Sequence, residues 1–381
     1  MKITNIEPLI LHVNHRGDWL FVLVHTDKNI TGIGEASHNG NDALAVAMLA
    51  QWNEKLVGQD PRQIRRIWES LTKLGQGRVI QTALSGLEQA LWDVLGQHLG
   101  VPIHMLLGGA VHERLRLYAN INRHVRERTP EGFARAAKQA VAEGFTAIKL
   151  APFDELKAPN HIRTGPKAAW RSGVARVEAV RAAIGDEVEL AVDCHSRMDE
   201  SEAIIVGQAL SDCNLFWLEE PVHHTQTDSL TRLTQALPMP TASAESVYRL
   251  EGFQPFLTDH VVDAIMPDIK HTGGVMETKY IAEAARMSKI LVAPHNPSGP
   301  VASAVTAQVV STASNFYILE HAWGEVDWRA DLLDPPERIE NGELVVSTLP
   351  GMGHRLNPDV VAEHRRDNAS SADSSKVVFS H

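Results

Sequence analysis

Three carboxylates recur at a constant interval in the middle of the sequence. Asp193, Glu219 and Glu245 each follow a short apolar segment, and 26 positions separate each from the next. In a parallel βα barrel one strand and one helix fill such an interval, so the three side chains would meet at the same end of neighbouring strands. Carboxylates directed at one point repel each other unless a cation lies among them, and all-oxygen ligation favours Mg²⁺ over Zn²⁺. The interval therefore predicts a site for one Mg²⁺ ion, whereas any one of these acids alone would count as a surface acid.

An acid and a histidine follow the next two strand-like segments. Asp268 ends the segment AIMPDI, and His295 ends ILVAPH. A carboxylate that is hydrogen-bonded to an imidazole fixes its tautomer and raises its basicity, which makes the histidine a general base. The alternative is a core histidine that is satisfied by a nearby acid. We expect the first arrangement because both residues follow the carboxylate series.

A second histidine lies two positions after Asp193, in the stretch VELAVDCHSRMD. Side chains alternate along a strand, so Asp193, His195 and Arg197 would begin on one face. If that face is the mouth of a barrel, His195 lies beside the metal. It would then supply the acid that a β-elimination needs, opposite the base His295. A structural or exposed histidine is the alternative.

Ionisable residues end every predicted strand from the second to the eighth. Buried charges are costly unless they are paired or metal-bound, so a purely structural barrel would have few of them there. Lys149 would contact a substrate carboxylate as a point charge, and Glu320 would hydrogen-bond the same group. A solvated lysine and a salt bridge at a strand end are the alternatives. The full series is Lys149, Asp193, Glu219, Glu245, Asp268, His295 and Glu320.

The hydrophobic pattern changes near residue 115. Before it, strand-like segments are followed by helical patterns around 42–56 and 60–73 and by a longer one that ends at Gly100 and Pro102. After it, eight short apolar segments alternate with helix-like stretches, which predicts a parallel barrel and leaves an open doubly wound sheet as the alternative. The tail reads as turn, strand and glycine-rich loop, followed by a polar segment, 365–381, that is expected to be mobile.

The composition limits the classes of partner. A formal net charge of −11 argues against a general nucleic-acid binder. No apolar run approaches the roughly 20 residues that a membrane span needs, and the N-terminal segment does not resemble a signal peptide. Two cysteines cannot form a disulfide framework, so we expect a cytoplasmic protein.

Several longer motifs resemble one known family. The segments TALSGLEQALWDVLG, PIHMLLGG, AVDCH, WLEEP, ASAES, MPDIKHTGG and PHNPSGPVA occur in this order. Together they resemble the enolase superfamily, mandelate racemase subgroup. The resemblance covers almost the whole chain. It implies an α/β fold: a (β/α)7β modified TIM barrel, residues 116–335, with an α+β N-terminal capping domain, residues 1–115. Residues 336–381 would return to the capping domain and complete it.

The resemblance also implies residue roles. Asp193, Glu219 and Glu245 match the Mg²⁺ ligands, Asp268 and His295 match the His–Asp dyad, and Glu320 matches the acid that hydrogen-bonds the substrate carboxylate. The Lys-x-Lys motif of racemases is reduced to Lys149-Leu150-Ala151, which argues against a two-base racemase. The Asp-x-His at 193–195 resembles that of acid-sugar dehydratases of the galactonate dehydratase type, in which the histidine expels the 3-hydroxyl. The family further implies a homo-oligomer built from dimers, up to an octamer.

Two loops are candidates for substrate contact. HVNHRGDW, between the first two strands, carries His15 and Arg16. The long stretch after the second barrel strand carries Arg163 along with His161 and Lys167, and is either a lid or an interface insertion. Asn122, after the first barrel strand, is also assigned to the substrate.

These observations predict a hydro-lyase. The enzyme would abstract the C2 proton of an aldonate or aldarate, expel the 3-hydroxyl and give a 2-keto-3-deoxy acid. An epimerase or cycloisomerase of the same subgroup, a non-catalytic metal-binding scaffold and a Zn²⁺ hydrolase are the alternatives. The sequence does not identify the sugar.

Overall fold

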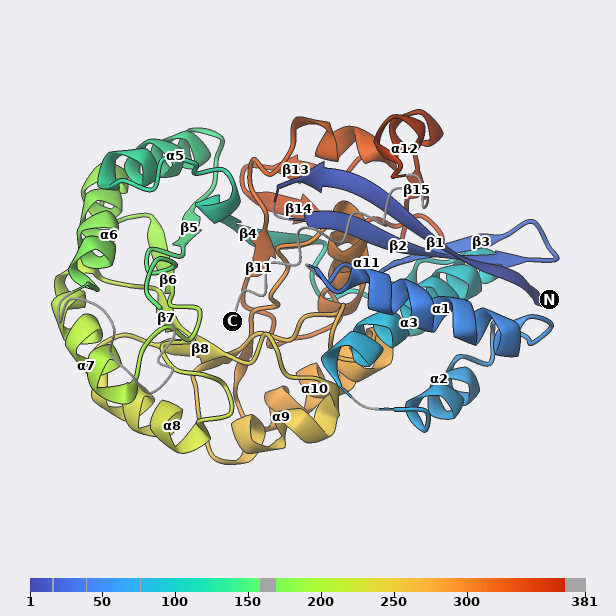
Figure 1. The fold of residues 1–381 in the computed structure, drawn as a ribbon, viewed down its shortest axis with the longest axis horizontal. Helices are drawn as coiled ribbons and strands as arrows, with labels where there is room; N and C mark the ends of the chain where they lie inside the picture. Colours follow the sequence, from blue (N-terminus) through green and yellow to red (C-terminus); the bar gives the residue numbers. More distant parts are fainter. Residues whose placement is uncertain (16, 39, 76, 158–168, 367–381) are drawn as a thin grey trace.

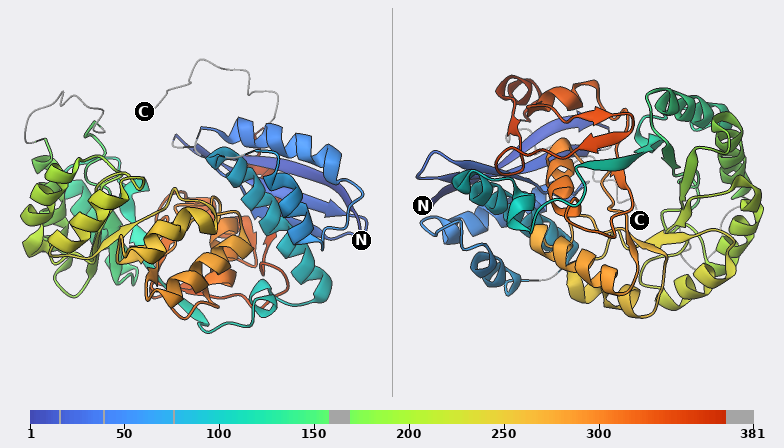
Figure 2. Two further views of the ribbon diagram at one scale, coloured as in Figure 1. Left: turned by 90° about the horizontal axis from the view of Figure 1, so that it is seen from below. Right: turned by 180° about the vertical axis from the view of Figure 1, so that it is seen from behind.

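A three-stranded antiparallel sheet and three helices form the first unit of the computed structural model, which describes residues 1–15, 17–38, 40–75, 77–157 and 169–366 (Figure 1). Seen from below, α1 and α3 lie against one face of this sheet (Figure 2). The elements are β1 (Ile3–Asn14), β2 (Gly17–Thr26), β3 (Thr31–Glu35), α1 (Asp42–Leu56), α2 (Ile64–Thr72) and α3 (Arg78–Leu99). The predicted strands and helices of this part are therefore present.

Eight parallel strands form a closed barrel. Consecutive strands pair from β4 to β10, β11 pairs with β4, and a bridge between Val292 and Phe316 joins β10 to the segment that enters β11. The barrel rules out the open doubly wound sheet. The strands are β4 (Arg114–Asn120), β5 (Ala147–Leu150), β6 (Glu189–Asp193), β7 (Trp217–Glu219), β8 (Thr241–Ser243), β9 (Ala264–Ile265), β10 (Leu291–Val292) and β11 (Leu319–His321).

Helices separate the barrel strands and pack on their outer side, which confirms the predicted (β/α)7β arrangement. The core between strands and helices is aliphatic, while a small inner core contains Tyr118 and Trp217, whose rings meet edge to face at 5.5 Å. The helices are α5 (Pro130–Ala142), α6 (Arg171–Ile184), α7 (Glu200–Ala209), α8 (Thr227–Ala236), α9 (Arg249–Thr258), α10 (Val275–Met287) and α11 (Pro300–Val310). No helix among the described residues is long and apolar enough to cross a membrane.

The segment after β11 contacts both units. Strand β14 pairs antiparallel with the beginning of β4, at the end of the barrel opposite the carboxylates. Helix α12 packs on β1, and Arg365 forms a bridge with Leu11. The sequence predicted a strand and a glycine-rich loop here but not α12, and the predicted domain boundaries stay a prediction. The remaining elements are α4 (Ile103–Leu106), β12 (Leu333–Asp334), β13 (Ile339–Glu340), β14 (Glu343–Val345), β15 (Arg355–Leu356) and α12 (Pro358–His364).

Buried carboxylates of the capping unit bind the N-termini of two barrel helices. Glu35 accepts hydrogen bonds from the backbone N–H groups of Gly299 and Ala302 at the start of α11, both at 2.9 Å. Glu88 accepts from Val275 at the start of α10, at 2.6 Å. These amides have no partner within their own helices, and a negative charge there is favoured by the helix dipole. The contacts fix the capping unit over the barrel mouth, where α10 and α11 follow the loops of Asp268 and His295.

Candidate active site

Three carboxylates converge at the C-terminal ends of β6, β7 and β8. Asp193 and Glu219 are direct neighbours across β6 and β7, and Glu245 lies two residues after β8. One oxygen from each lies within 4.8 Å of the others. The equal interval in the sequence thus corresponds to a shared level in the barrel.

The environment of the triad fits a cation. Burial, followed by the charge of Asp193, raises the pKa of Glu219 to about 8. The buried Oε2 atom of Glu245 accepts no hydrogen bond from the residues that the structure describes, although His295 Nε2 lies 3.1 Å away. Oxygen-only donors with an unused lone pair are the ligand set of a hard divalent ion. The residues present therefore fit a bound metal.

Lys149 and Glu320 form a buried ion pair beside the triad. Lys149 Nζ lies 2.9 Å from Glu219 Oε1 and 3.1 Å from Glu320 Oε1. Burial alone would lower the pKa of Lys149, but the charges of Glu219 and Glu320 hold it well above its usual range. Glu320 also accepts from the Asn120 side chain, at 2.6 Å, and from the backbone N–H of Asn296, at 2.7 Å. Lys149 is thus a fixed positive charge rather than a proton acceptor.

Asp268 orients His295. The Nδ1 atom of His295 donates to Asp268 Oδ2 at 2.8 Å. Burial would raise the pKa of Asp268, but Lys270 and His271 lower it far below its usual range, so Asp268 is ionised. An ionised acceptor at Nδ1 leaves Nε2 as the basic nitrogen, and Nε2 is the atom that faces Glu245.

His195 reaches the same triad from the other flank. Its Nε2 atom lies 2.9 Å from Asp193 Oδ2, and its Nδ1 atom lies 2.5 Å from Asp154 Oδ1. Burial would lower the pKa of His195, but Asp193 and Asp154 raise it well above its usual range. The predicted alternation through Arg197 is wrong, because β6 ends at Asp193. His195 and Ser196 then take positive φ values of 45° and 57°, which turn the chain out of the strand.

The sequence did not reveal the residues that hold the imidazole of His195 in its orientation. Asp154 Oδ2 accepts from Arg128 Nη2 at 3.1 Å and from Asn122 Nδ2 at 3.4 Å. Arg128 also donates to Asn122 Oδ1 at 2.7 Å. Asn122 therefore lies in the network behind His195, and its predicted contact with substrate stays a prediction. The only signal for Asp154 was its place four residues after β5, in the long loop.

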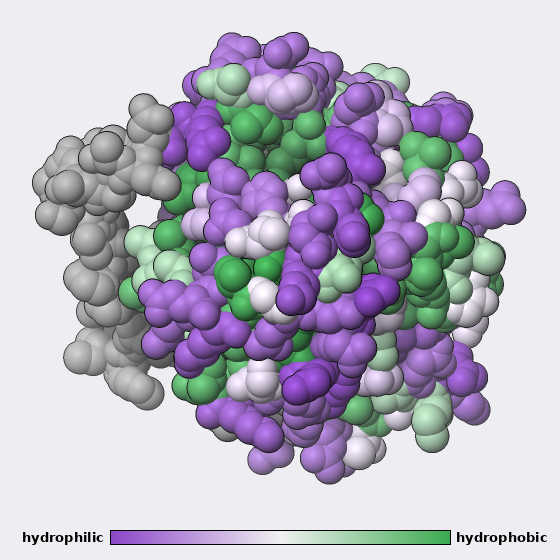
Figure 3. All heavy atoms as spheres, turned by 90° about the vertical axis from the view of Figure 1, so that its right-hand side faces the viewer, coloured by the Kyte–Doolittle hydropathy of each residue, from purple (hydrophilic) through white to green (hydrophobic). Residues whose placement is uncertain are grey.

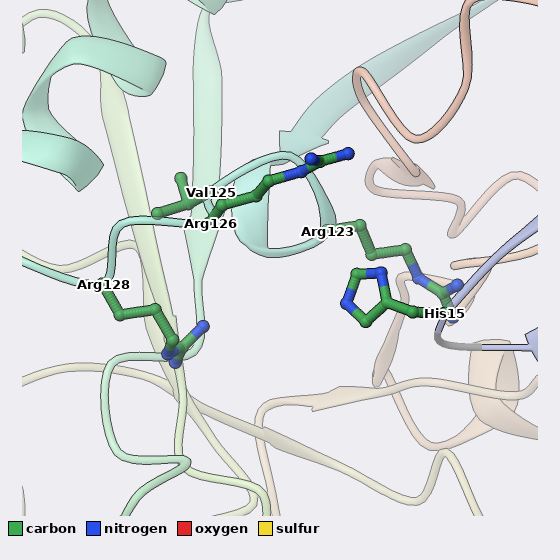
Figure 4. Close-up of a pocket in the computed structure, with 5 residues that line it drawn as sticks. All are labelled: His15, Arg123, Val125, Arg126 and Arg128. Carbon is green, nitrogen blue, oxygen red and sulfur yellow. The ribbon is translucent and has the colours of Figure 1, made fainter.

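A cavity of about 400 Å³ lies between the turn that joins β1 to β2 in the capping unit and the loop after β4. Figure 4 shows the imidazole of His15 beside the guanidinium of Arg123, with Arg128 on the other side. Arg123 forms an ion pair with Glu325. The candidates Arg16 and Arg163, with His161 and Lys167, lie outside the described residues. The cavity is lined by His15, Arg123, Val125, Arg126 and Arg128.

A capped (β/α)7β barrel with carboxylates on three successive strands defines an enolase-type protein. Residues 132–360 match the family model described as enolase C-terminal domain-like, and residues 2–108 match the mandelate racemase / muconate lactonizing enzyme N-terminal domain. The chain therefore belongs to the mandelate racemase / muconate lactonizing enzyme family of the enolase superfamily.

Its relatives resemble it over nearly their whole length. D-xylonate dehydratase from Haloferax volcanii is 34% identical, covering 95% of this chain and 89% of the relative. D-galactonate dehydratase from Verminephrobacter eiseniae is 32% identical, covering 92% and 91%. Among solved structures, a mandelate racemase/muconate lactonizing enzyme-like protein from Rubrobacter xylanophilus superposes with a TM-score of 0.87 at 32% identity, covering 96% and 98%.

Proposed function

We propose that this protein is a Mg²⁺-dependent sugar-acid dehydratase that converts an aldonate or aldarate into a 2-keto-3-deoxy acid. One observation carries the proposal. Two histidines place Nε2 beside different carboxylates of the triad, His195 beside Asp193 and His295 beside Glu245. Each has its own carboxylate at Nδ1. A base and an acid at two sides of one metal site are what the elimination of water requires. The relatives named D-xylonate dehydratase and D-galactonate dehydratase support the same function.

The carboxylate triad would hold the ion. Asp193, Glu219 and Glu245 supply oxygen donors of the kind that Mg²⁺ prefers. When bound, the ion supplies positive charge that stabilises the substrate carboxylate as negative charge builds up on it. Lys149 and Glu320 orient that carboxylate from the opposite side.

The two histidines divide the proton transfers. His295 Nε2 removes the proton from C2, and ionised Asp268 stabilises the imidazolium that forms. The electron pair of the C2–H bond is first delocalised into the substrate carboxylate, and it then forms the C2–C3 double bond as the 3-hydroxyl leaves. His195 donates a proton to this hydroxyl, which departs as water. The enol then tautomerises to the 2-keto-3-deoxy acid.

The geometry disfavours a two-base racemase. Such an enzyme needs a basic group on the face opposite His295. The position of the second lysine of racemases is Ala151 in this chain, and the ammonium of Lys149 is bound between Glu219 and Glu320. His15, Arg16, Asn122 and Arg163 are proposed to contact the remainder of the sugar.

A substrate screen tests the proposal. The protein would be incubated with Mg²⁺ and a panel of C4 to C6 aldonic and aldaric acids, and 2-keto acids would be detected as semicarbazones. We expect at least one substrate, with Glu219→Gln as the inactive control. A blank screen with the metal shown to be bound would contradict the dehydratase and favour an epimerase, a cycloisomerase or a non-catalytic scaffold.

We also propose a cytoplasmic homo-oligomer built from dimers, up to an octamer, with no nucleic-acid partner. The net charge of −11 supports the last point. Hydrophilic side chains cover most of the face at the capping unit, with hydrophobic ones in small separate groups, so this face does not suggest the interface (Figure 3). Light scattering of the purified chain would give the subunit number, and a monomer would contradict the proposal.

A further inference from the structure

Buried polar nitrogens that have no hydrogen-bond partner in the described part of the chain gather around the first turn of α3. They are His38 Nε2 in the loop after β3, Arg78 Nε and Gln81 Nε2 on α3, and Arg249 Nη2 at the start of α9. Gln81 is fully buried. Buried N–H groups are almost always hydrogen-bonded, so four of them in one place point to an acceptor that the described residues do not supply.

Contacts join these residues into one cluster, which we call the α3 anion cluster: His38, Arg78, Gln81, Arg249 and His271. Arg249 Nε donates to Gln81 Oε1 at 3.2 Å, and Arg78 precedes Gln81 by three residues on the same face of the helix. The ring of His38 lies 5.5 Å from that of His271. His271 in turn is hydrogen-bonded to Thr82, in the second turn of α3, at 2.8 Å.

The unpaired atoms are donors. The guanidinium and amide nitrogens can only donate. The Nδ1 atom of His38 faces the side-chain amide of Asn41 at 3.3 Å, an arrangement in which Nδ1 accepts and Nε2 carries the proton. Helix α3 adds its own first-turn amides, since its N-cap, Gly77, has no side chain to bind them. All these donors need a hydrogen-bond acceptor, such as an oxygen atom with free lone pairs.

The local charge is positive. Arg78 and Arg249 form no ion pair with any residue that the structure describes. Two acids lie beside the cluster: Asp42 accepts from the backbone N–H of His38 at 2.7 Å, and Asp268 already has Lys270 at 3.5 Å and His295 at 2.8 Å. Burial first and Arg78 second hold the pKa of His38 below its usual range. Burial, the neighbouring His223 and Arg78 lower the pKa of His224 to about 4. Water would satisfy the donors without balancing two arginines, whereas an anion does both.

The α3 anion cluster adjoins the catalytic end of the barrel. His271 follows Asp268 by three residues in the loop after β9, and its Nε2 atom lies 3.7 Å from Asp268 Oδ2. Asp268 is the partner of His295. A sugar acid with its C1 carboxylate at the triad and C2 at His295 would extend its far end between the capping unit and this loop.

We infer that the α3 anion cluster binds a second anionic group, a carboxylate or a phosphate ester, at the far end of the substrate. The preferred substrate is then a doubly anionic sugar acid rather than a simple aldonate. This inference rests on the proposed dehydratase function for its substrate, but the anion site itself does not.

Matched substrates test the inference. For each sugar configuration the aldonate, the aldarate and the aldonate 6-phosphate would be compared by kcat/KM with Mg²⁺. We expect one doubly charged series to exceed the aldonate at least about tenfold, the effect of one or two charge-assisted hydrogen bonds. The two series separate a carboxylate site from a phosphate site. Equal or better turnover of the plain aldonates would overturn the inference while leaving the dehydratase intact.

Variants of Arg78 distinguish the effect of the α3 anion cluster on substrate binding from the effect of the catalytic groups. Arg78→Gln should raise KM for the doubly charged substrate about tenfold and leave aldonate kinetics within about twofold, and Arg78→Lys should restore part of the loss. Arg66→Gln, on the exposed face of α2, is the matched control. Unchanged KM in Arg78→Gln, with a native unfolding profile, would overturn the inference.

A binding measurement keeps the test independent of turnover. Calorimetric titration of the Mg²⁺-loaded protein with inorganic phosphate and with a C4 dicarboxylate should show binding of one of them that Arg78→Gln loses. If every sugar acid is inert and this binding is observed, the dehydratase proposal fails and the anion site stands. If neither probe binds, the anion site fails whatever the screen finds.

Discussion

His195 and His295 have similar surroundings but different tasks in the proposed reaction. Each donates from Nδ1 to a carboxylate and presents Nε2 to the triad. We expect His195→Asn to lower dehydration by at least roughly 100-fold, because general acid catalysis of the leaving hydroxyl is lost. Exchange of the C2 proton should persist, since His295 and Asp268 are unchanged. The experiment follows 2-keto acid formation and loss of the C2–H signal in D₂O by NMR. Full turnover in the variant would favour an epimerase or cycloisomerase.

Asp154 acts through His195 rather than on the substrate. It holds Nδ1 at 2.5 Å and is itself held by Arg128. Asp154→Asn should reduce kcat about tenfold or more with little change in KM, and Asp154→Glu should recover part of it. The neighbouring Glu155→Gln is the control, because Glu155 pairs with Arg128 and Arg176 but not with His195. An equal loss of kcat in Glu155→Gln would mean that the structure of this loop, rather than the orientation of His195, determines kcat.

Sequence reasoning found residues that end strands and missed those that act from loops. A strand fixes where its last side chain points, so the spacing of Asp193, Glu219 and Glu245 was enough to bring them together. Asp154 and Arg128 lie on loops, whose course depends on packing that no periodicity records. The turn at His195 also escaped prediction, because the stretch looks extended until the positive φ values are known.

Helices α10 and α11 are held to the capping unit by acids that belong to other elements. Glu88 is fully buried, and burial raises its pKa from 4.5 to about 7. The folded protein thus binds this proton more tightly than the unfolded chain does. The resulting stabilisation is complete below about pH 4.5 and is lost as the pH rises through about 7.

Comparison with Glu88→Gln isolates this effect. The free energy of unfolding of the wild type, relative to that of the variant, should fall by about 2 kcal/mol between pH 5 and pH 8. Urea unfolding of both proteins at several pH values gives the difference. A difference that does not change with pH would show that Glu88 has the same pKa in the folded and unfolded chain.

The elements themselves were largely predictable. Even two-residue strands such as β9 and β10 were found, because their apolar segments alternate regularly with amphipathic helices. Helix α12 was not, since none of its residues is buried and no apolar stripe marks it. The contacts of Glu35 and Glu88 across the two units could not be read from the sequence either, because long-range packing creates them.

At the scale of the whole molecule, the metal site couples binding to stability. Without an ion, the carboxylates of the triad face each other within 4.8 Å at the mouth of the barrel, and Lys149, His195 and His295 offset them only in part. An ion that binds only the folded protein stabilises it by about 3 kcal/mol at a concentration of 100 times its Kd. We therefore expect chelator-treated protein to gain a few degrees in Tm when Mg²⁺ is added.

The choice of ion then decides between reaction classes. Glu219→Gln should abolish the gain in Tm, because an amide replaces one of the three carboxylate ligands of the ion. Mn²⁺ should replace Mg²⁺, since both accept oxygen ligands, and differential scanning calorimetry with matched activity assays would measure both effects. Tight stoichiometric Zn²⁺ that alone raises Tm and supports turnover would contradict the magnesium site and favour a hydrolase. The acid-only triad makes this outcome the less expected one, because catalytic zinc sites are built mainly from histidine and cysteine.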